Sequence, residues 1–392
     1  MRSYQSPPNG SGRAEIVIDC YNCIKSPLNQ YIYHLVNGKN IISLSQNTKQ
    51  TNTMRMKHFF LAIAALVVTM TASAQSNNTF ADEHLSLSGY LQGGYSWDTD
   101  SNPETTFYLK RARISLTGNA PEEKFDYRLQ VDMAGSPKIC DLYFRYKPSP
   151  AFGMQIGQFK LPFAIENDIY GPTKFEFIDY SYITTLFARN NAQYDGLAAT
   201  GRDLGFQVYG SLGEADGYHA LSYNIGIFNG AGINGKDHNS SKDLVGRVIY
   251  KPSKELSFTA SYMYAETDVK INEEITREYV ESPRWAIGAI YDNKSVLVRS
   301  EYAEAQFGNM HVASFYAMAG YQLTKTWGLY ARYEFLNHER ESIHSDNLDR
   351  ITIAGVYKPY DFLRIQINYS HTIKQNHEPY GTALNFMVTT IF

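Results

Sequence analysis

The chain has 392 residues, of which 43% are hydrophobic and only 19% are charged, and its 31 Tyr and 21 Phe help to bring the aromatic fraction to 14%. This length allows two or three soluble domains or one large barrel, and so many aromatic residues favour a barrel with two aromatic girdles around a lipid-facing band. The formal net charge of −3 offers no basic excess of the kind that nucleic-acid binding requires.

The first informative pattern lies at residues 54–75, MRMKHFFLAIAALVVTMTASAQ. A basic start around Lys57, an apolar run over residues 59–70 and the small residues 72–74 are the three parts of a secretory signal, with cleavage before Gln75. A transmembrane helix is the alternative, but the apolar run of about a dozen residues is shorter than the roughly 20 that span a bilayer. We therefore expect residues 54–74 to be a cleaved signal peptide and the protein to be exported.

Translation then starts at Met54 or Met56, and residues 1–53 are expected to be an unstructured upstream extension. This extension contains the pair Cys20 and Cys23, which lacks the second pair or the His residues of a zinc site. Residues 1–74 hold seven Lys and Arg and two Asp and Glu, so the 29 basic and 37 acidic residues that follow give the mature chain a net charge of −8. The mature chain keeps only Cys140, and no metal or cofactor site is expected.

From Leu85 onward, runs of about ten residues alternate apolar and polar side chains, which is typical of strands with two different faces. In the clearest run, residues 124–133, Phe125, Tyr127 and Leu129 share one face while Asp126 and Arg128 share the other. A soluble sandwich also alternates, but it would not keep so many aromatic residues at strand ends. The runs predict an all-β transmembrane antiparallel barrel of about 16 strands over residues 75–392, with expected strands at 85–97, 107–117, 124–133, 140–147, 152–158, 204–212, 218–228, 244–251, 256–264, 285–291, 296–302, 313–323, 327–335, 351–357, 363–369 and 384–392.

The connections alternate between short turns and long polar loops, as in outer-membrane barrels. Three short turns share a Tyr-Lys-Pro pattern, beginning at Tyr146, Tyr250 and Tyr357. Longer connections follow at 229–242, 267–282 and 338–347. The last strand ends on an aromatic residue, Phe392, which resembles the signal that barrel-assembly machinery reads.

The polar strand faces are expected to line the lumen, so charged residues on them are candidate pore residues. Arginine holds phosphate or carboxylate groups in its fixed fork of donors, and basic rows therefore indicate an anion path. Acids such as Asp126, Asp141 and Glu301 are interleaved, so cross-strand pairing that only stiffens the wall is an equally good interpretation. The predicted pore-lining or anion-binding residues are Arg111, Arg113, Arg128, Arg145, Lys147, Lys160, Lys174, Arg189, Arg299 and Arg332, and Arg247 and Arg364 also fall on polar faces.

The longest interruption of the strand pattern runs from Leu161 to Gly201. A loop of this length is usually functional, and its aromatic cluster (Phe175, Phe177, Tyr180) would let it fold inward and narrow the pore. A loop on the outer surface is the alternative.

The stretches YLKRARISLTG (108–118), FDYRLQVDM (125–133) and DLYFRYKPSPAFGMQIGQFKLPF (141–163), together with the closing strand, resemble the phosphate-selective porin O and P family in its Bacteroidetes-type branch. The resemblance covers essentially all of the mature chain. It implies a 16-stranded barrel, a homotrimer and an anion path lined by Arg and Lys, with basic character carried onto Arg111, Arg113, Arg145 and Lys160. The acids Glu166, Asp168, Glu176 and Asp179 in the long loop weigh against selectivity for phosphate itself.

The sequence thus predicts an outer-membrane porin for passive diffusion of small solutes, with outer-membrane lipid, small anions such as phosphate and the barrel-assembly machinery as partners. Two other functions stay open. A non-conducting barrel for ligand binding or adhesion would have its lumen plugged by the long loop, and a barrel hydrolase would need a nucleophile and base, for which no Gly-x-Ser-x-Gly element is present.

Overall fold

The computed structural model of the 392-residue chain describes residues 34–37, 40–43, 84–120, 124–188, 194–195, 201–237, 240–271, 274–307, 310–339, 347–374 and 379–392. The chain forms two units, residues 1–79 and 80–392. The first unit contains a hairpin of β1 (His34–Asn37) and β2 (Asn40–Ser43). An isolated two-stranded hairpin is marginally stable at best. The signal peptide at 54–74 and the pair Cys20 and Cys23 lie outside the described residues, and the start site and cleavage stay predictions.

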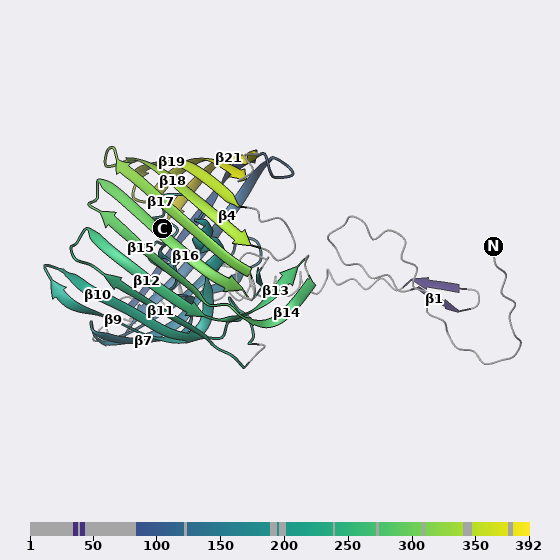
Figure 1. Cartoon of the computed structure of the whole chain (residues 1–392), viewed down its shortest axis with the longest axis horizontal. Coiled ribbons are helices and arrows are strands. Elements are labelled where there is room, and N and C mark those ends of the chain that lie inside the picture. The colour runs from purple at the N-terminus through teal and green to yellow at the C-terminus, as the bar shows by residue number, and fades with distance from the viewer. Residues whose placement is uncertain are drawn as a thin grey trace, which may run out of the picture. The chain divides into compact units, whose positions relative to one another are not determined.

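The second unit is a closed antiparallel barrel of 16 strands (Figure 1). All sixteen predicted strands are present, most of them longer than expected. Their bounds are β3 (Leu85–Asp98), β4 (Thr105–Asn119), β5 (Phe125–Asp132), β6 (Lys138–Ser149), β7 (Phe152–Lys160), β9 (Arg202–Ala215), β10 (Tyr218–Phe228), β11 (Asp243–Tyr250), β12 (Leu256–Tyr264), β15 (Arg284–Asp292), β16 (Val296–Phe307), β17 (Met310–Gln322), β18 (Trp327–Glu339), β19 (Leu348–Tyr360), β20 (Leu363–Lys374) and β21 (Pro379–Ile391).

The barrel closes between its last and first strands, β21 and β3, which pair from Ala383 opposite Asp98 to Ile391 opposite Tyr90. Beyond this ladder, the amide of Gly89 donates to the carbonyl of Phe392, and the amide of Phe392 donates back to Gly89. Closure leaves no free sheet edge, which a strand structure within a bilayer requires. None of the helices in the described ranges is long and apolar enough to cross a membrane.

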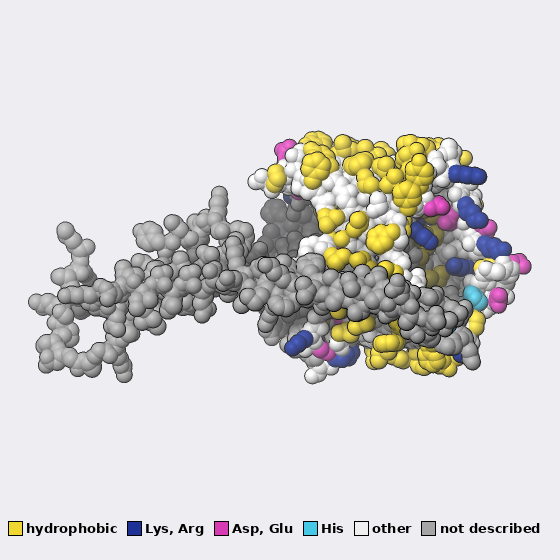
Figure 2. Space-filling model, turned by 180° about the vertical axis from the view of Figure 1, so that it is seen from behind, with side chains coloured by type: hydrophobic (Ala, Val, Ile, Leu, Met, Phe, Trp, Pro, Cys, Tyr) yellow, Lys and Arg dark blue, Asp and Glu magenta, His cyan; other side chains and the backbone are white. Residues whose placement is uncertain are grey.

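The strand alternation places apolar side chains outside and polar ones inside. On β12, Ser257, Thr259 and Ser261 face the interior and are nearly fully buried, whereas Phe258 and Tyr262 face outward and are about half exposed. Figure 2 shows the resulting apolar surface of the barrel wall, with charged side chains near its ends. This arrangement is the reverse of a soluble protein and fits a wall that faces hydrocarbon.

The two ends of the barrel differ in their connections. Short turns join β6 to β7, β11 to β12 and β19 to β20, while the connections from β7 to β9, β10 to β11 and β12 to β15 are long and lie at the other end. Three connections at the long-loop end are short as well, namely residues 133–137 between β5 and β6, 308–309 between β16 and β17, and 375–378 between β20 and β21. The connection after β12 forms a hairpin of β13 (Glu266–Ile271) and β14 (Glu274–Glu281), which pairs with β8 (Tyr194–Asp195) (Figure 1).

The long loop after β7 folds inward, as predicted. It contains the short helices α3 (Ile165–Asp168) and η2 (Ile183–Ala188), and its residues Phe163, Phe177 and Phe187 are fully buried. They belong to a cluster that includes interior-facing small or apolar residues of the wall, such as Ala303 and Val312. The loop therefore packs against the part of the wall whose inner face leaves room for aromatic side chains.

Candidate functional site

The candidate site is the part of the lumen that the long loop leaves open. It is a cavity of about 420 Å³ between the strands β3 to β10 and the loop segment around Gly171, Pro172 and Thr173. Five basic and two acidic side chains line it: Arg113, Arg128, Arg145, Lys160, Arg202, Asp141 and Asp168. Tyr90, Tyr143 and Tyr209 and the amides of Gln130, Gln155, Gln207 and Asn224 complete its polar lining.

The basic residues of this wall are held by acids on nearby strands. Nε of Arg145 lies 2.6 Å from an oxygen of Asp126, whose other oxygen lies 2.9 Å from Nζ of Lys147. Nε of Arg202 lies 2.7 Å from Asp141, and Nε of Arg128 lies 3.6 Å from the same carboxylate. These pairs fix the guanidinium groups in place, so cross-strand pairing and a basic lumen are both present.

Arg113 is also nearly fully buried. Its Nε donates to Asp132 at 2.8 Å and its Nη1 donates to the hydroxyl of Tyr90 at 3.1 Å. On the opposite side of the cavity, Asp168 of the loop forms an ion pair with Arg247 of β11. Nζ of Lys160 donates to the carbonyl of Asn167 at 2.5 Å, so the wall also holds the entry of the loop.

A second group of charged residues lies behind the loop and fastens it to β16, β18 and β19. Glu166 of the loop, fully buried, lies 3.3 Å from Nη2 of Arg299 and 3.6 Å from Nη1 of Arg332. Its other oxygen accepts a hydrogen bond of 2.8 Å from the amide of Ser181, at the far side of the loop. Glu334 lies 3.1 Å from Arg332 and 2.7 Å from Arg350. The carboxylates and guanidinium groups thus compensate one another in a buried network.

Backbone atoms of the loop are held by the wall as well. Arg364 donates to the carbonyls of Thr173 and Phe175, at 2.7 and 2.5 Å. Glu301 accepts a hydrogen bond of 2.9 Å from the amide of Ile165, and Gln92 donates to the carbonyl of Pro172. The side chains on both flanks of the open cavity therefore determine where the loop stands in the lumen.

The structure separates the predicted site residues into distinct places. Arg113, Arg128, Arg145 and Lys160 line the open cavity, and Lys147 lies beside it on Asp126. The buried positions of Arg299 and Arg332, whose guanidinium groups bind the loop, contradict a pore-lining role for these two. The remaining predicted residues are Arg111, Lys174 and Arg189, and the first two are not among the described residues that line the cavity.

Arg111 is buried and donates to Gln92, and its guanidinium lies over the ring of Tyr180 in the loop, outside the cavity lining. Lys174 is exposed on the loop turn after Thr173. Arg189 lies outside the described residues. The loop acids Glu166 and Glu176 are turned to the wall, so they do not face the open cavity.

Sequence reasoning missed two features. Arg202 lines the cavity but lies at the junction of the loop and β9. The alternating pattern has not yet begun there, so the sequence does not indicate whether its side chain faces the lumen or the lipid. The connection from β10 to β11 also turns inward, because Asp203 accepts a hydrogen bond of 2.6 Å from the amide of Gly230 and Gln158 accepts one of 2.7 Å from Asn234. Positive φ angles at Gly230, Gly232 and Asn234 shape this second loop.

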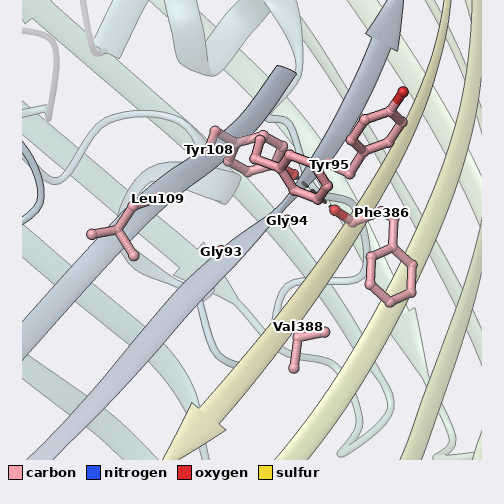
Figure 3. A pocket seen from close by; sticks show the side chains of 8 residues that line it. Gly93, Gly94, Tyr95, Tyr108, Leu109, Phe386 and Val388 are labelled. Carbon is pink, nitrogen blue, oxygen red and sulfur yellow. Dashed lines mark hydrogen bonds between the residues drawn. The ribbon is translucent and has the colours of Figure 1, made fainter. Parts of the chain in front are cut away.

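An apolar groove of about 390 Å³ on the outside of the barrel is distinct from this site. Gly93 and Gly94 of β3 form its floor, and Tyr95, Leu109, Phe386 and Val388 surround them (Figure 3). The hydroxyl of Tyr108 donates to the carbonyl of Phe386 at 3.3 Å across the closing seam. The groove lies on the lipid-facing side and takes no part in the lumen.

A closed 16-stranded barrel with an apolar exterior, an inward loop and a polar open lumen defines a membrane channel. The model of the family "Phosphate-selective porin O and P" matches residues 87–387, and the chain belongs to this family. It is an outer-membrane porin, and its short turns therefore face the periplasm.

The chain is similar to one reported sequence relative and to several solved structures. An uncharacterized protein of Aquifex aeolicus is 21% identical over 362 residues, which cover 77% of this chain and 80% of the relative. Among solved structures, the anion-selective porin from Comamonas acidovorans has a TM-score of 0.61 at 12% identity, covering 79% of this chain and 99% of that chain. The outer membrane channel DcaP of Acinetobacter baumannii has a TM-score of 0.58 at 12% identity, with 79% and 97% covered. At these identities the structures share the fold.

Proposed function

We propose that this porin is a passive diffusion channel that favours small anions over cations. The observation that supports this function is the excess of five basic over two acidic side chains around the open cavity. Fixed charges of one sign at a constriction raise the local concentration of the opposite ion. The family name and the anion-selective porin of Comamonas acidovorans point in the same direction.

The selectivity is expected to be modest. Most of the guanidinium groups share their charge with Asp126, Asp132 or Asp141, so a permeating anion meets partly neutralised groups. Arg128 and Arg145 have the most accessible of the lining guanidinium groups, with side chains 34% and 32% exposed. They are the residues that contribute most to the anion preference.

The test is the reversal potential of the protein, purified from outer membranes, in a planar bilayer under a gradient of potassium chloride. The wild type should be anion selective, and Arg128→Gln with Arg145→Gln should move the reversal potential toward zero. In this variant Asp141 still has its ion pair with Arg202, and Asp126 still has its ion pair with Lys147, so neither carboxylate is left without a basic partner. Lys325→Gln, in the turn after β17, is the matched control, because it removes a basic residue outside the cavity lining.

An unchanged reversal potential in the double variant would show that these guanidinium groups do not select the ion. Absence of any current would instead favour the plugged, non-conducting barrel. Hydrolysis of lipid or peptide by the purified protein would favour the barrel hydrolase.

We also propose that the channel works as a homotrimer in the outer-membrane lipid. A related fold, OmpT of Vibrio cholerae, has been solved in a trimer form, with a TM-score of 0.56 at 14% identity. Phe392, 61% exposed at the end of the closing seam, remains the candidate contact for the barrel-assembly machinery. Native mass spectrometry of the detergent-extracted protein tests the trimer, since a monomeric mass would exclude it.

A further inference from the structure

The cavity wall presents a row of hydrogen-bonding side chains in addition to its charges. Strand register places Asp126 of β5 opposite Arg145 of β6, Arg145 opposite Gln155 of β7, and Gln155 opposite Gln207 of β9. Adjacent strands lie roughly 4.8 Å apart, so this row of four side chains extends about 14 Å along the wall. That length exceeds what a single small oxyanion needs.

One end of the row carries polar atoms that the protein leaves without a partner. Gln207 is 6% exposed, and its Nε2 donates to Oε1 of Gln155 at 2.9 Å, while its own Oε1 has no hydrogen-bond partner. The hydroxyl of Tyr209, two residues further along the same face of β9, is also buried and without a partner. Buried polar groups in native proteins are normally paired, so these two atoms point to a ligand.

The chemistry of these atoms differs from that of an anion site. The carbonyl oxygen of Gln207 accepts a hydrogen bond and cannot bind an oxygen that only accepts, whereas a hydroxyl group can donate to it. The hydroxyl of Tyr209 donates and accepts. Arg145 is separated from Gln207 by Gln155 in this row. Its guanidinium can hold a carboxylate or phosphate.

We infer that the channel's preferred solutes are compact organic anions that carry several hydroxyl groups, with the anionic group at Arg145 and the hydroxyls at Gln207 and Tyr209. A cavity of about 420 Å³ has room for such a molecule. The inference rests on the proposed anion channel and adds to it the class of solute. Inorganic phosphate would use the guanidinium end of the row and leave most of the other end unpaired.

Block of the chloride current separates these solutes. Gluconate and hexanoate both have six carbons and one carboxylate, and they differ in their hydroxyl groups. In the wild-type protein, purified from outer membranes, gluconate should half-block the current at a concentration about threefold to tenfold lower than hexanoate, the factor expected for a net gain of one or two hydrogen bonds.

Gln207→Leu and Tyr209→Phe should each bring the two half-blocking concentrations closer together by a factor of about three. Tyr209→Phe removes a single oxygen, so it tests the inference even if the leucine variant folds poorly. The control is Tyr262→Phe on the lipid-facing side of β12, which should keep the full preference for gluconate.

Equal block by gluconate and hexanoate in the wild type would overturn the inference, as would a preference that both variants keep unchanged. The proposed anion selectivity is judged separately by the reversal potential in chloride alone, so an anion-selective channel without a gluconate preference contradicts only the inferred class of solute. A channel that prefers cations contradicts both.

Discussion

Glu166 is predicted to determine whether the long loop stays on the wall. Its carboxylate is fully buried and joins Arg299, Arg332 and the amide of Ser181, so it connects two wall strands with both sides of the loop. In Glu166→Gln the side-chain shape and an acceptor for Ser181 remain, but the negative charge is lost. The two guanidinium groups keep only Glu176 and Glu334 as anionic partners.

Removal of one partner from a buried ion pair costs about 3–5 kcal/mol, and we expect the lower figure because the amide retains a hydrogen bond. A change of about 3 kcal/mol shifts the equilibrium between docked and detached loops by a factor of about 100. The barrel itself should stay folded, because no strand ladder depends on Glu166.

Two measurements test this reasoning. Limited proteolysis of the detergent-solubilised protein should cleave the variant within residues 161–201 much faster than the wild type, and single-channel recordings should show a larger and noisier conductance. The control is Asp179→Asn, which removes a loop carboxylate that is 54% exposed and pairs with Lys110, because an exposed ion pair contributes little to stability. A Glu166→Gln variant with wild-type proteolysis and conductance would refute the prediction that Glu166 holds the loop on the wall.

Two further predictions concern the barrel seam and the loop. Gly94→Ala should prevent closure of the barrel, because the added Cβ would lie 1.8 Å from the carbonyl oxygen of Phe386 (Figure 3). The control Gly246→Ala should be tolerated, because the nearest atom to its added Cβ is 3.8 Å away. Heat-modifiable mobility in gels measures barrel closure, and equal folding of the two variants would contradict the reasoning. The side chain of Asp179 is about half exposed, and its partial desolvation acts to raise its pKa, but Lys110, 2.5 Å away, together with Arg350 and Arg332 holds this pKa below the usual 3.8. The small contribution of Asp179 to loop packing is therefore present above pH 4 and is lost only as the pH falls through the lowered pKa. Lys110→Gln should raise the pKa of Asp179. An unchanged titration of this carboxyl group in isotope-edited infrared spectra of the variant would contradict the prediction.

Much of the fold follows from local pattern. Period-2 alternation marks every barrel strand, because each residue in a wall faces either lipid or lumen, and short turns such as that at Tyr146 mark the strand ends. The inward course of the long loop follows from its aromatic cluster. The wall on which it packs could also have been recognised, since Ala286, Ala303 and Ala305 occupy inward positions that polar residues would otherwise fill.

The division of the charged residues could not be predicted in the same way. Arg128 of β5 and Arg299 of β16 both occupy inward positions in the alternating pattern of their strands. Arg128 lines the open cavity, however, whereas Arg299 binds the loop. Their difference depends on contacts with residues more than 100 positions away in the chain, such as Glu166, and on strand order around the barrel.

The sequence by itself determined that this protein is a membrane β-barrel with charged side chains on its lumen face and a long inward loop, because side-chain alternation and loop composition are local properties that each strand and loop carries alone. The tertiary structure decided which strands the loop contacts, which arginines remain accessible to a solute, and which amide and hydroxyl groups stand unpaired beside them. These features arise only when the barrel closes, because closure brings distant strands to opposite sides of one lumen into which the loop folds.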